Sequence, residues 1–136
     1  MIAAEAMSPS PYVARSSDSV GQVVRVLSEA DVRHLPIVDE GTLVGIVSDR
    51  DLRAVVPWTL TEPSEPAEAR RILAQPIASL MSSDVVSVDA ETELVEVIDL
   101  MVEHKIRAVP VVEAGSAKLV GIVSYVDVLR TLRNQG

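Results

Sequence analysis

Two short motifs in the chain place a carboxylate three residues after a hydroxyl. They are Ser48-x-x-Asp51 and Ser124-x-x-Asp127, and each follows the run Gly-Ile-Val. A serine at this position can cap a helix, and an acidic residue in the first turn suits the positive end of the helix dipole. A helix start can also attract a phosphate, and a carboxylate can accept both hydrogen bonds of a ribose diol. The motifs therefore predict capped helices. A more specific interpretation is that each helix start also binds a ligand.

Catalytic chemistry has little support in this sequence. No histidine lies locally to activate either serine, and the chain contains no G-x-x-x-x-G-K-[ST] loop. Cysteine is absent, which excludes disulfides and thiolate ligands, and His34 and His104 lack the spacing of a zinc site. We expect no enzyme, no metal site and no required cofactor.

Composition limits the class of protein further. The chain has 136 residues and a formal net charge of −8, which disfavours binding to nucleic-acid phosphates. No apolar run reaches membrane-spanning length, and the first residues do not resemble a signal peptide. We expect a cytoplasmic protein with no nucleic-acid or membrane partner.

The serine motifs recur because the chain repeats itself. Residues 33–38 return as residues 107–112, 74 positions later, and residues 45–51 return as 121–127, 76 positions later. Two copies of one unit must bury their apolar faces on each other, which predicts a shared cleft and a pseudo-twofold axis. We expect copy one over residues 1–56, a Pro-rich linker over 57–76 and copy two over 77–136.

Each copy is predicted to run strand, helix, strand, strand, helix. The first helix of each copy has an apolar face with helical spacing, and Asp18 and Thr92 are its predicted N-caps. A hairpin follows, with glycine in the turn, and a short second helix begins just after Ser48 or Ser124. The linker tail, residues 67–73, is predicted to form one or two helical turns.

In order, spacing and repetition, these motifs resemble the CBS domain, named for cystathionine β-synthase. The pattern is Met7-Ser8, an amphipathic helix, Arg-x-hydrophobic-Pro-hydrophobic-Val, and Gly-Ile-Val-Ser-x-x-Asp, and it covers about residues 6–53 and 77–130. Two copies in tandem resemble a stand-alone CBS pair, or Bateman module. The resemblance implies an α/β (α+β) fold in which two pseudo-symmetric β-α-β-β-α motifs pack sheet to sheet.

The resemblance also implies binding of adenosyl compounds, such as AMP, ADP, ATP or S-adenosylmethionine, in the cleft between copies. In such modules the Asp of the serine motif holds the ribose, the Ser lies near the phosphate, and the first strand and the residues before the proline hold the base. One candidate site on this chain consists of Ser48, Arg50, Asp51, Val85, Val86, Ile106 and Arg107. The other consists of Ser124, Asp127, Val13, Ala14, Val32, Arg33 and His34.

The two candidate sites differ in charge. Arg50 precedes Asp51, whereas Val126 occupies the matching position in copy two. Because guanidinium groups form strong bonds with phosphate oxygens, we expect the Asp51 site to favour the more phosphorylated ligand. The alternative for these arginines is surface ion pairing with the many carboxylates, which contributes little.

A ligand-binding regulatory protein is the function that these features favour. The alternative is a dimeric scaffold whose clefts hold no ligand. The resemblance implies a homodimer formed through the helices, and the regulated protein is not identified by the sequence.

Overall fold

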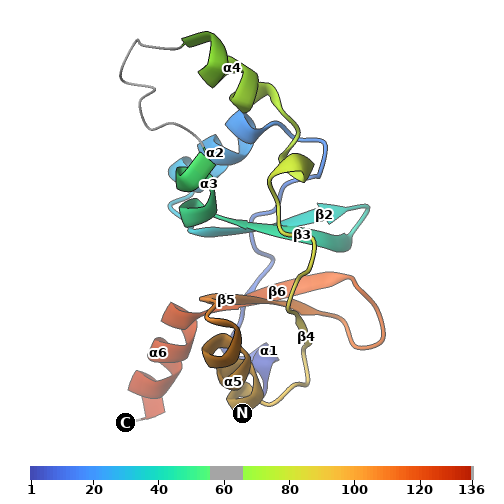
Figure 1. Ribbon diagram of the computed structural model, residues 1–136. Coiled ribbons are helices and arrows are strands. Elements are labelled where there is room, and N and C mark those ends of the chain that lie inside the picture. The colour runs from blue at the N-terminus through green and yellow to red at the C-terminus, as the bar shows by residue number, and fades with distance from the viewer. Residues whose placement is uncertain (56–65, 136) are drawn as a thin grey trace. The chain divides into compact units, whose positions relative to one another are not determined.

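Helices and strands alternate through residues 1–55 and 66–135, the part of the chain that the computed structural model describes. They form two compact units, each built around its own sheet (Figure 1). Each unit is named after the repeat copy that supplies most of its residues. The first-copy unit comprises Tyr12–Asp39 and Val44–Val85, and the second-copy unit comprises Met1–Pro11, Glu40–Leu43 and Val86–Gly136. The predicted mixed α/β class is confirmed.

The first-copy unit contains most of the elements of copy one. Its elements are α2 (Val20–Glu29), β2 (His34–Asp39), β3 (Thr42–Ser48, whose first two residues belong to the other unit), α3 (Asp49–Val55), α4 (Pro66–Ala74) and the 3-10 helix η2 (Ile77–Ser79). The helical turns predicted for residues 67–73 are thus confirmed as α4, whereas residues 57–65 of the predicted linker lie outside the described part.

The second-copy unit repeats the order helix, hairpin, helix, and its short helix α1 (Ala3–Ala6) lies at the repeat position of η2, 74 residues earlier in the chain. Its other elements are β1 (Ser8–Pro9), β4 (Val88–Asp89), α5 (Leu94–His104), β5 (Ala108–Val112), β6 (Leu119–Ser124) and α6 (Tyr125–Gln135). Its sheet has the order β1-β6-β5-β4, with β1 and β5 antiparallel to β6 and β4 parallel to β5.

The opening Met-Ser segment of each copy pairs with the last strand of the other copy. Ser8 lies opposite Ile122 in β6, and Ser82 forms the equivalent bridge to Ile46 in β3. Each contact lies within one compact unit, so residues 1–11 fold with residues 86–135 although they open copy one. The repeat boundaries predicted from the sequence and the compact units therefore divide the chain differently.

Glycines make room for these exchanged segments. A Cβ atom added to Gly121 would lie 2.3 Å from the sulfur of Met7, and one added to Gly45 would lie 2.5 Å from the sulfur of Met81. Neither position holds a side chain without displacing the methionine. The glycine of each Gly-Ile-Val-Ser run is therefore needed for packing.

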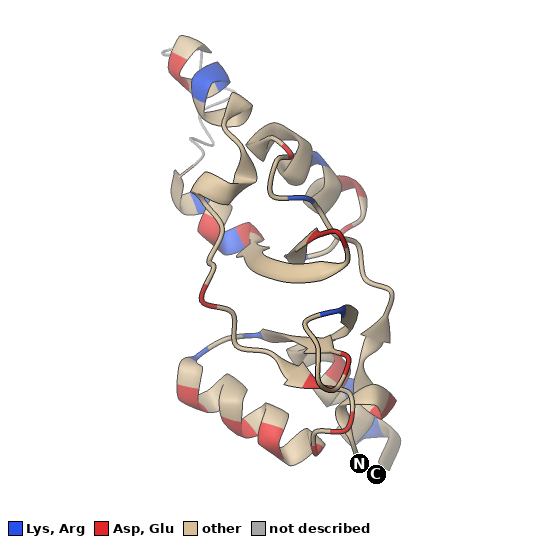
Figure 2. Ribbon diagram, turned by 90° about the vertical axis from the view of Figure 1, so that its right-hand side faces the viewer, with Lys and Arg blue, Asp and Glu red and all other residues tan. Residues whose placement is uncertain are grey.

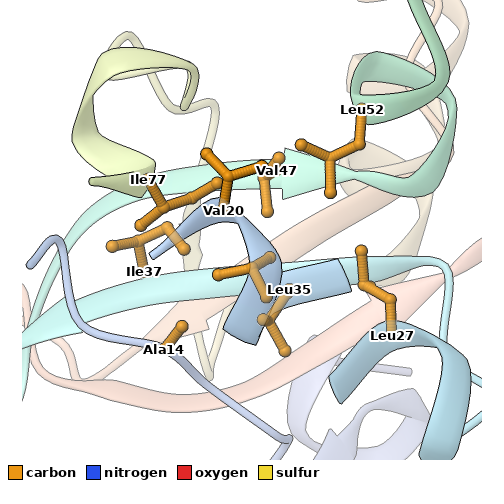
Figure 3. Close-up of a cluster of buried hydrophobic side chains, with 9 residues drawn as sticks. Ala14, Val20, Leu27, Leu35, Ile37, Val47, Leu52 and Ile77 are labelled. Atoms are coloured by element: carbon orange, nitrogen blue, oxygen red, sulfur yellow. The ribbon is translucent and has the colours of Figure 1, made fainter. Parts of the chain in front are cut away.

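Aliphatic side chains fill both cores. In the first-copy unit, Leu35, Ile37 and Val47 of the hairpin pack with Val20 of α2 and Ile77 of η2 (Figure 3). In the second-copy unit, Val109, Val111 and Val123 occupy equivalent positions. Burying side chains of this size stabilises the fold by roughly 1.5–3 kcal/mol each, so neither unit needs aromatic residues.

Two predicted helix caps are wrong by one residue. Ser19, not Asp18, caps α2, since its hydroxyl accepts from the Gln22 amide and the Gln22 side chain accepts from the Ser19 amide. Glu93, not Thr92, precedes α5 and makes no side-chain cap bond. The Asp18 carboxylate instead accepts a hydrogen bond from the Arg15 amide, and the Thr92 hydroxyl donates one to the Asp89 carboxylate. Asp18 and Thr92 therefore bond to residues that precede them, and each helix begins later than predicted.

Candidate functional site

The Ser-Asp motif of the first-copy unit joins β3 to α3. The Ser48 hydroxyl accepts a hydrogen bond from the Asp51 amide at 3.0 Å, which confirms the predicted capping role of this serine. The Asp51 side chain is exposed. Within residues 1–55 and 66–135, its carboxylate oxygens accept no hydrogen bond. This carboxylate is available to a ligand.

The equivalent motif of the second-copy unit is closed. The Asp127 side chain is 7% exposed, and its carboxylate accepts hydrogen bonds from the Ser124 amide at 2.8 Å and the Ser124 hydroxyl at 3.0 Å. The Ser8 hydroxyl of the exchanged N-terminal segment donates a third at 3.2 Å. Arg130 adds a weak ion pair at 3.8 Å. The oxygens of Asp127 are occupied by the protein itself.

The two motifs thus share a sequence pattern but differ in what they can do. A ribose diol needs an acceptor whose oxygens are unoccupied, and Asp51 provides one. At Asp127 a diol would have to replace bonds from Ser8 and Ser124, and replacing a buried charge-assisted bond costs about 1.5–3 kcal/mol. Of the two carboxylates, Asp51 is the better ligand group.

The segment before each proline lies against a helix start of its own unit. The Asp49 amide donates to the Arg33 carbonyl at 2.8 Å, and the Tyr125 amide donates to the Arg107 carbonyl at 2.9 Å. The Arg107 guanidinium also lies 5.7 Å from the centre of the Tyr125 ring. Arg33 and Arg107 are exposed, and His34 is half-buried at the start of β2.

The predicted first-strand residues differ in exposure. Ala14 is buried and forms a parallel bridge to Ile37, its amide donating to the Pro36 carbonyl at 3.1 Å, whereas neighbouring Val13 is 44% exposed. Val85 and Val86 are half-buried just before β4.

Two pairs of predicted site residues lie together within a unit: Ser48 with Asp51, and Ser124 with Asp127. Ala14 contacts Pro36 and Ile37 of β2, which are not among the predicted site residues. The grouping of Ser48, Arg50 and Asp51 with Val85, Val86, Ile106 and Arg107 stays a prediction. The grouping of Ser124 and Asp127 with Val13, Ala14, Val32, Arg33 and His34 also stays a prediction.

A pocket of about 310 Å³ lies in the first-copy unit between α2 and α3. Val32 and Arg33 belong to its lining, but Ser48 and Asp51 do not; the other lining residues are Val24, Leu27, Ser28, Asp31, Asp49, Leu52 and Arg53. Asp49 and Arg53 of this lining form an ion pair at 3.1 Å. Sequence reasoning missed this pocket, although the i, i+4 spacing of those two charges was a signal of a shared helix face.

Ser16 and Asp39 form a further polar contact that the sequence prediction did not include. The carboxylate of Asp39, at the end of β2, accepts hydrogen bonds from the Ser16 hydroxyl at 2.6 Å and the Ser16 amide at 3.0 Å. These bonds hold the pKa of Asp39 below its ordinary value of 3.8. The contact fixes the segment after Ala14 against the hairpin.

Residues 1–55 and 66–135 contain neither a metal-binding cluster nor a membrane-spanning helix. No three His, Asp or Glu side chains there gather closely enough to hold a metal ion, and no helix there has the length and apolar character needed to cross a bilayer.

Comparison with known proteins gives a consistent pattern. The sequence profile of the CBS domain matches residues 3–57 and 77–134. An uncharacterized protein, YlbB of Bacillus subtilis, is 35% identical over 112 residues, which are 81% of this chain and 68% of YlbB. Inosine-5'-monophosphate dehydrogenase of Methanocaldococcus jannaschii is 28% identical over 114 residues, but the match spans only 20% of that enzyme.

Solved structures show the same fold with ligands bound. CBSX2 in complex with AMP is 31% identical, with a TM-score of 0.81, and the match covers 98% of this chain and 96% of CBSX2. The CBS domain pair of protein MJ0100, in complex with 5-methylthioadenosine and S-adenosyl-L-methionine, is 27% identical, with a TM-score of 0.79. That match covers 100% of this chain and 98% of the pair.

Proposed function

Because the chain belongs to the CBS domain family, as a tandem pair, we propose that it is a regulatory module that binds an adenosyl compound. The observation that carries the proposal is the exposed carboxylate of Asp51, which accepts no hydrogen bond from residues 1–55 and 66–135 and lies beside a capped helix start. The complexes of CBSX2 with AMP and of the MJ0100 pair with adenosyl ligands support the ligand class.

In this proposal, the Asp51 carboxylate accepts hydrogen bonds from both hydroxyls of a ribose, and the Arg50 guanidinium binds phosphate oxygens. A ligand regulates by binding one conformation of the chain more tightly than another, and the shift cannot exceed that difference in affinity. The protein carries no catalytic role, requires no cofactor and works in the cytoplasm. It acts as a homodimer on a regulated protein that ligand binding switches.

The test is a melting experiment on the full chain with AMP, ADP, ATP, S-adenosylmethionine and NAD. A ligand at 100 times its Kd stabilises the native state by about 2.7 kcal/mol, which raises Tm by roughly 5–10 °C for a chain of this size. We expect at least one compound to produce this shift and Asp51→Ala to abolish it. Asp99→Ala, which removes an exposed carboxylate on α5, is the matched control and should retain it.

The second candidate function is a dimeric scaffold without a ligand. The environment of Asp127 favours the scaffold for one of the two motifs, because that carboxylate already accepts hydrogen bonds from the protein itself. Melting curves that do not move with any compound on the panel would support the scaffold and contradict the sensor.

A further inference from the structure

The repeat places two serines, Ser8 and Ser82, at equivalent positions 74 residues apart. Ser8 pairs with Ile122 of β6, and Ser82 pairs with Ile46 of β3, so each opening segment lies against the second hairpin strand of its unit. The Ser-Asp motif of each unit begins at the last residue of that strand. The two serines therefore occupy matching places with respect to the two motifs.

The hydroxyls of these serines differ in what they bond. The Ser8 hydroxyl donates a hydrogen bond to Oδ1 of Asp127 at 3.2 Å. Ser82 is exposed, and among the residues that the structure describes its hydroxyl makes no hydrogen bond to Asp51 or to any other group. A side chain of the opening segment thus bonds to the motif carboxylate in the second-copy unit but not in the first-copy unit.

The hydrogen bonds to Asp127 divide between its two carboxylate oxygens. Ser124 donates both its amide and its hydroxyl to Oδ2, whereas Ser8 donates to Oδ1. The Arg130 guanidinium is 3.8 Å from Oδ1. Because each carboxylate oxygen has two lone pairs, Ser124 satisfies Oδ2 completely. Oδ1 is therefore the atom that a ligand hydroxyl can use once Ser8 has released it.

The bond from Ser8 to Asp127 can be exchanged without movement of the backbone. Its length of 3.2 Å exceeds the about 2.5–2.7 Å that is typical of a hydroxyl bonded to a carboxylate. Ser8 is an exposed residue of β1, which is the edge strand of its sheet. Rotation of the side chain to another rotamer therefore transfers the Ser8 hydroxyl to water and leaves the pairing of β1 with β6 intact.

We propose that Ser8 sets the affinity of the second-copy motif, because its hydroxyl competes with a ribose hydroxyl for Oδ1 of Asp127. Ser8 acts through Asp127 and is a positioning residue. The first-copy motif, whose carboxylate has no such competitor, fills first, and the second-copy motif fills only at a higher ligand concentration. The inference rests on the proposed function, since it requires a ligand with a diol, and it explains how two similar motifs bind with unequal affinity.

Adenosine is the probe, because every adenosyl compound contains its ribose and because adenosine has no phosphate. A phosphate would add charge effects in this unit, where acidic residues recur along α5 (Figure 2) and Val126 stands in place of the arginine before Asp51. Binding is followed by the NMR shifts of the Ser124 and Asp127 amides. The parent chain carries Asp51→Ala, which removes the carboxylate of the first-copy motif.

Removal of the Ser8 hydroxyl is expected to tighten adenosine binding at the second-copy motif. Ser8→Ala should lower the Kd about tenfold, the factor that corresponds to a weak hydrogen bond to a charged group. Ser8→Thr keeps a hydroxyl and should keep the Kd of the parent chain. Ser82→Ala removes the equivalent hydroxyl of the other opening segment and is the matched control, so its Kd should also equal that of the parent.

Adenosine analogues that lack one hydroxyl distinguish competition from a general loosening of the site. The gain in affinity of Ser8→Ala should disappear with either 2′-deoxyadenosine or 3′-deoxyadenosine, whichever lacks the hydroxyl that meets Oδ1 of Asp127. A structural effect of the substitution does not depend on a ligand hydroxyl. Equal gains with adenosine and with both deoxy analogues would therefore overturn the inference.

The remaining outcomes separate this inference from the proposed function. An unchanged or higher Kd in Ser8→Ala overturns the inference, as does a second-copy motif that binds no adenosine in any variant. The ligand proposal is judged independently, by a melting shift of the wild type that Asp51→Ala abolishes. Circular dichroism of each variant distinguishes a change at the site from loss of folding.

Discussion

Two aspartates in the same motif have different environments, and this difference predicts different roles. Asp127 is buried and accepts three hydrogen bonds, whereas Asp51 is exposed and accepts none among the residues described. Burial and satisfied bonding are typical of a structural carboxylate. Exposure with unoccupied oxygens is what a binding group requires before its ligand arrives.

Asparagine at each position separates stability from binding. Asp127→Asn is expected to lower the free energy of unfolding by about 2–3 kcal/mol, since it removes the charge from a buried hydrogen-bonded group. Asp51→Asn is expected to change it by no more than about 0.5 kcal/mol but to weaken ligand binding. Urea unfolding measures the first effect and ligand titration the second. Equal stability losses in the two variants would contradict the structural role of Asp127.

The Ser16–Asp39 contact predicts a pH effect at the same scale. The pKa of Asp39 in the folded chain is lowered from 3.8, so its contribution to stability is complete above that value and is lost as pH falls through the folded pKa. Ser16→Ala removes the hydroxyl bond and should raise the pKa of Asp39 toward 3.8 in an NMR titration. Ser17→Ala, an exposed neighbour, is the control. An unchanged pKa in Ser16→Ala would show that the hydroxyl is not the cause.

At the scale of elements, the opening segment of each copy packs so closely against a strand that it restricts which residue the strand can hold at the contact. Met7 lies over Gly121 and Met81 over Gly45, with no space for a Cβ atom. Each glycine is therefore required by the contact between two segments that are distant in sequence. The strand that contains the glycine does not by itself explain why the position must be glycine.

Alanine at these glycines is expected to be destabilising. Gly121→Ala should cost about 1–3 kcal/mol, the usual cost of overpacking a well-filled site. Gly21→Ala, inside α2, is a control of opposite sign: its Cβ would lie 3.4 Å from the Leu73 carbonyl oxygen, an ordinary contact, and helix propensity should stabilise the chain by roughly 0.5–1 kcal/mol. Thermal unfolding of both variants measures the difference. If Gly121→Ala were as stable as the wild type, the methionine would have to move at no cost.

At the scale of the whole chain, the opening segments belong to the compact unit of the opposite copy. Residues 1–11 supply α1, β1, the Met7 contact and the Ser8 bond to Asp127, all within the second-copy unit. Contact between distant segments, not proximity in sequence, defines each unit.

Deletion of residues 1–11 tests this assignment. We expect the amides of residues 86–135 to lose protection in hydrogen exchange, while those of residues 20–52 keep it, because protection follows the cooperative unit that is damaged. Loss of protection confined to residues 20–52 would show instead that the segment supports the copy it opens.

The sequence by itself determined the family and most of the elements, although the opening strand predicted for copy one, near residues 12–14, is only an isolated bridge at Ala14. Hydrophobic periodicity, turn glycines and the 74- and 76-residue offsets identified two α/β copies, and the helices after Ser48 and Ser124 begin where predicted. Cap positions were missed by one residue, because Ser19 competes with Asp18 and only the backbone geometry decides which one accepts the helix amides.

Tertiary structure alone decided which of two matching motifs is open. Asp51 and Asp127 stand in similar sequence, but Asp127 is closed by Ser8, 119 residues away. The pocket between α2 and α3 likewise depends on side chains from separate elements. Local pattern fixes a residue's secondary structure because its causes lie within a few positions, whereas burial and bonding depend on segments that only folding brings into contact.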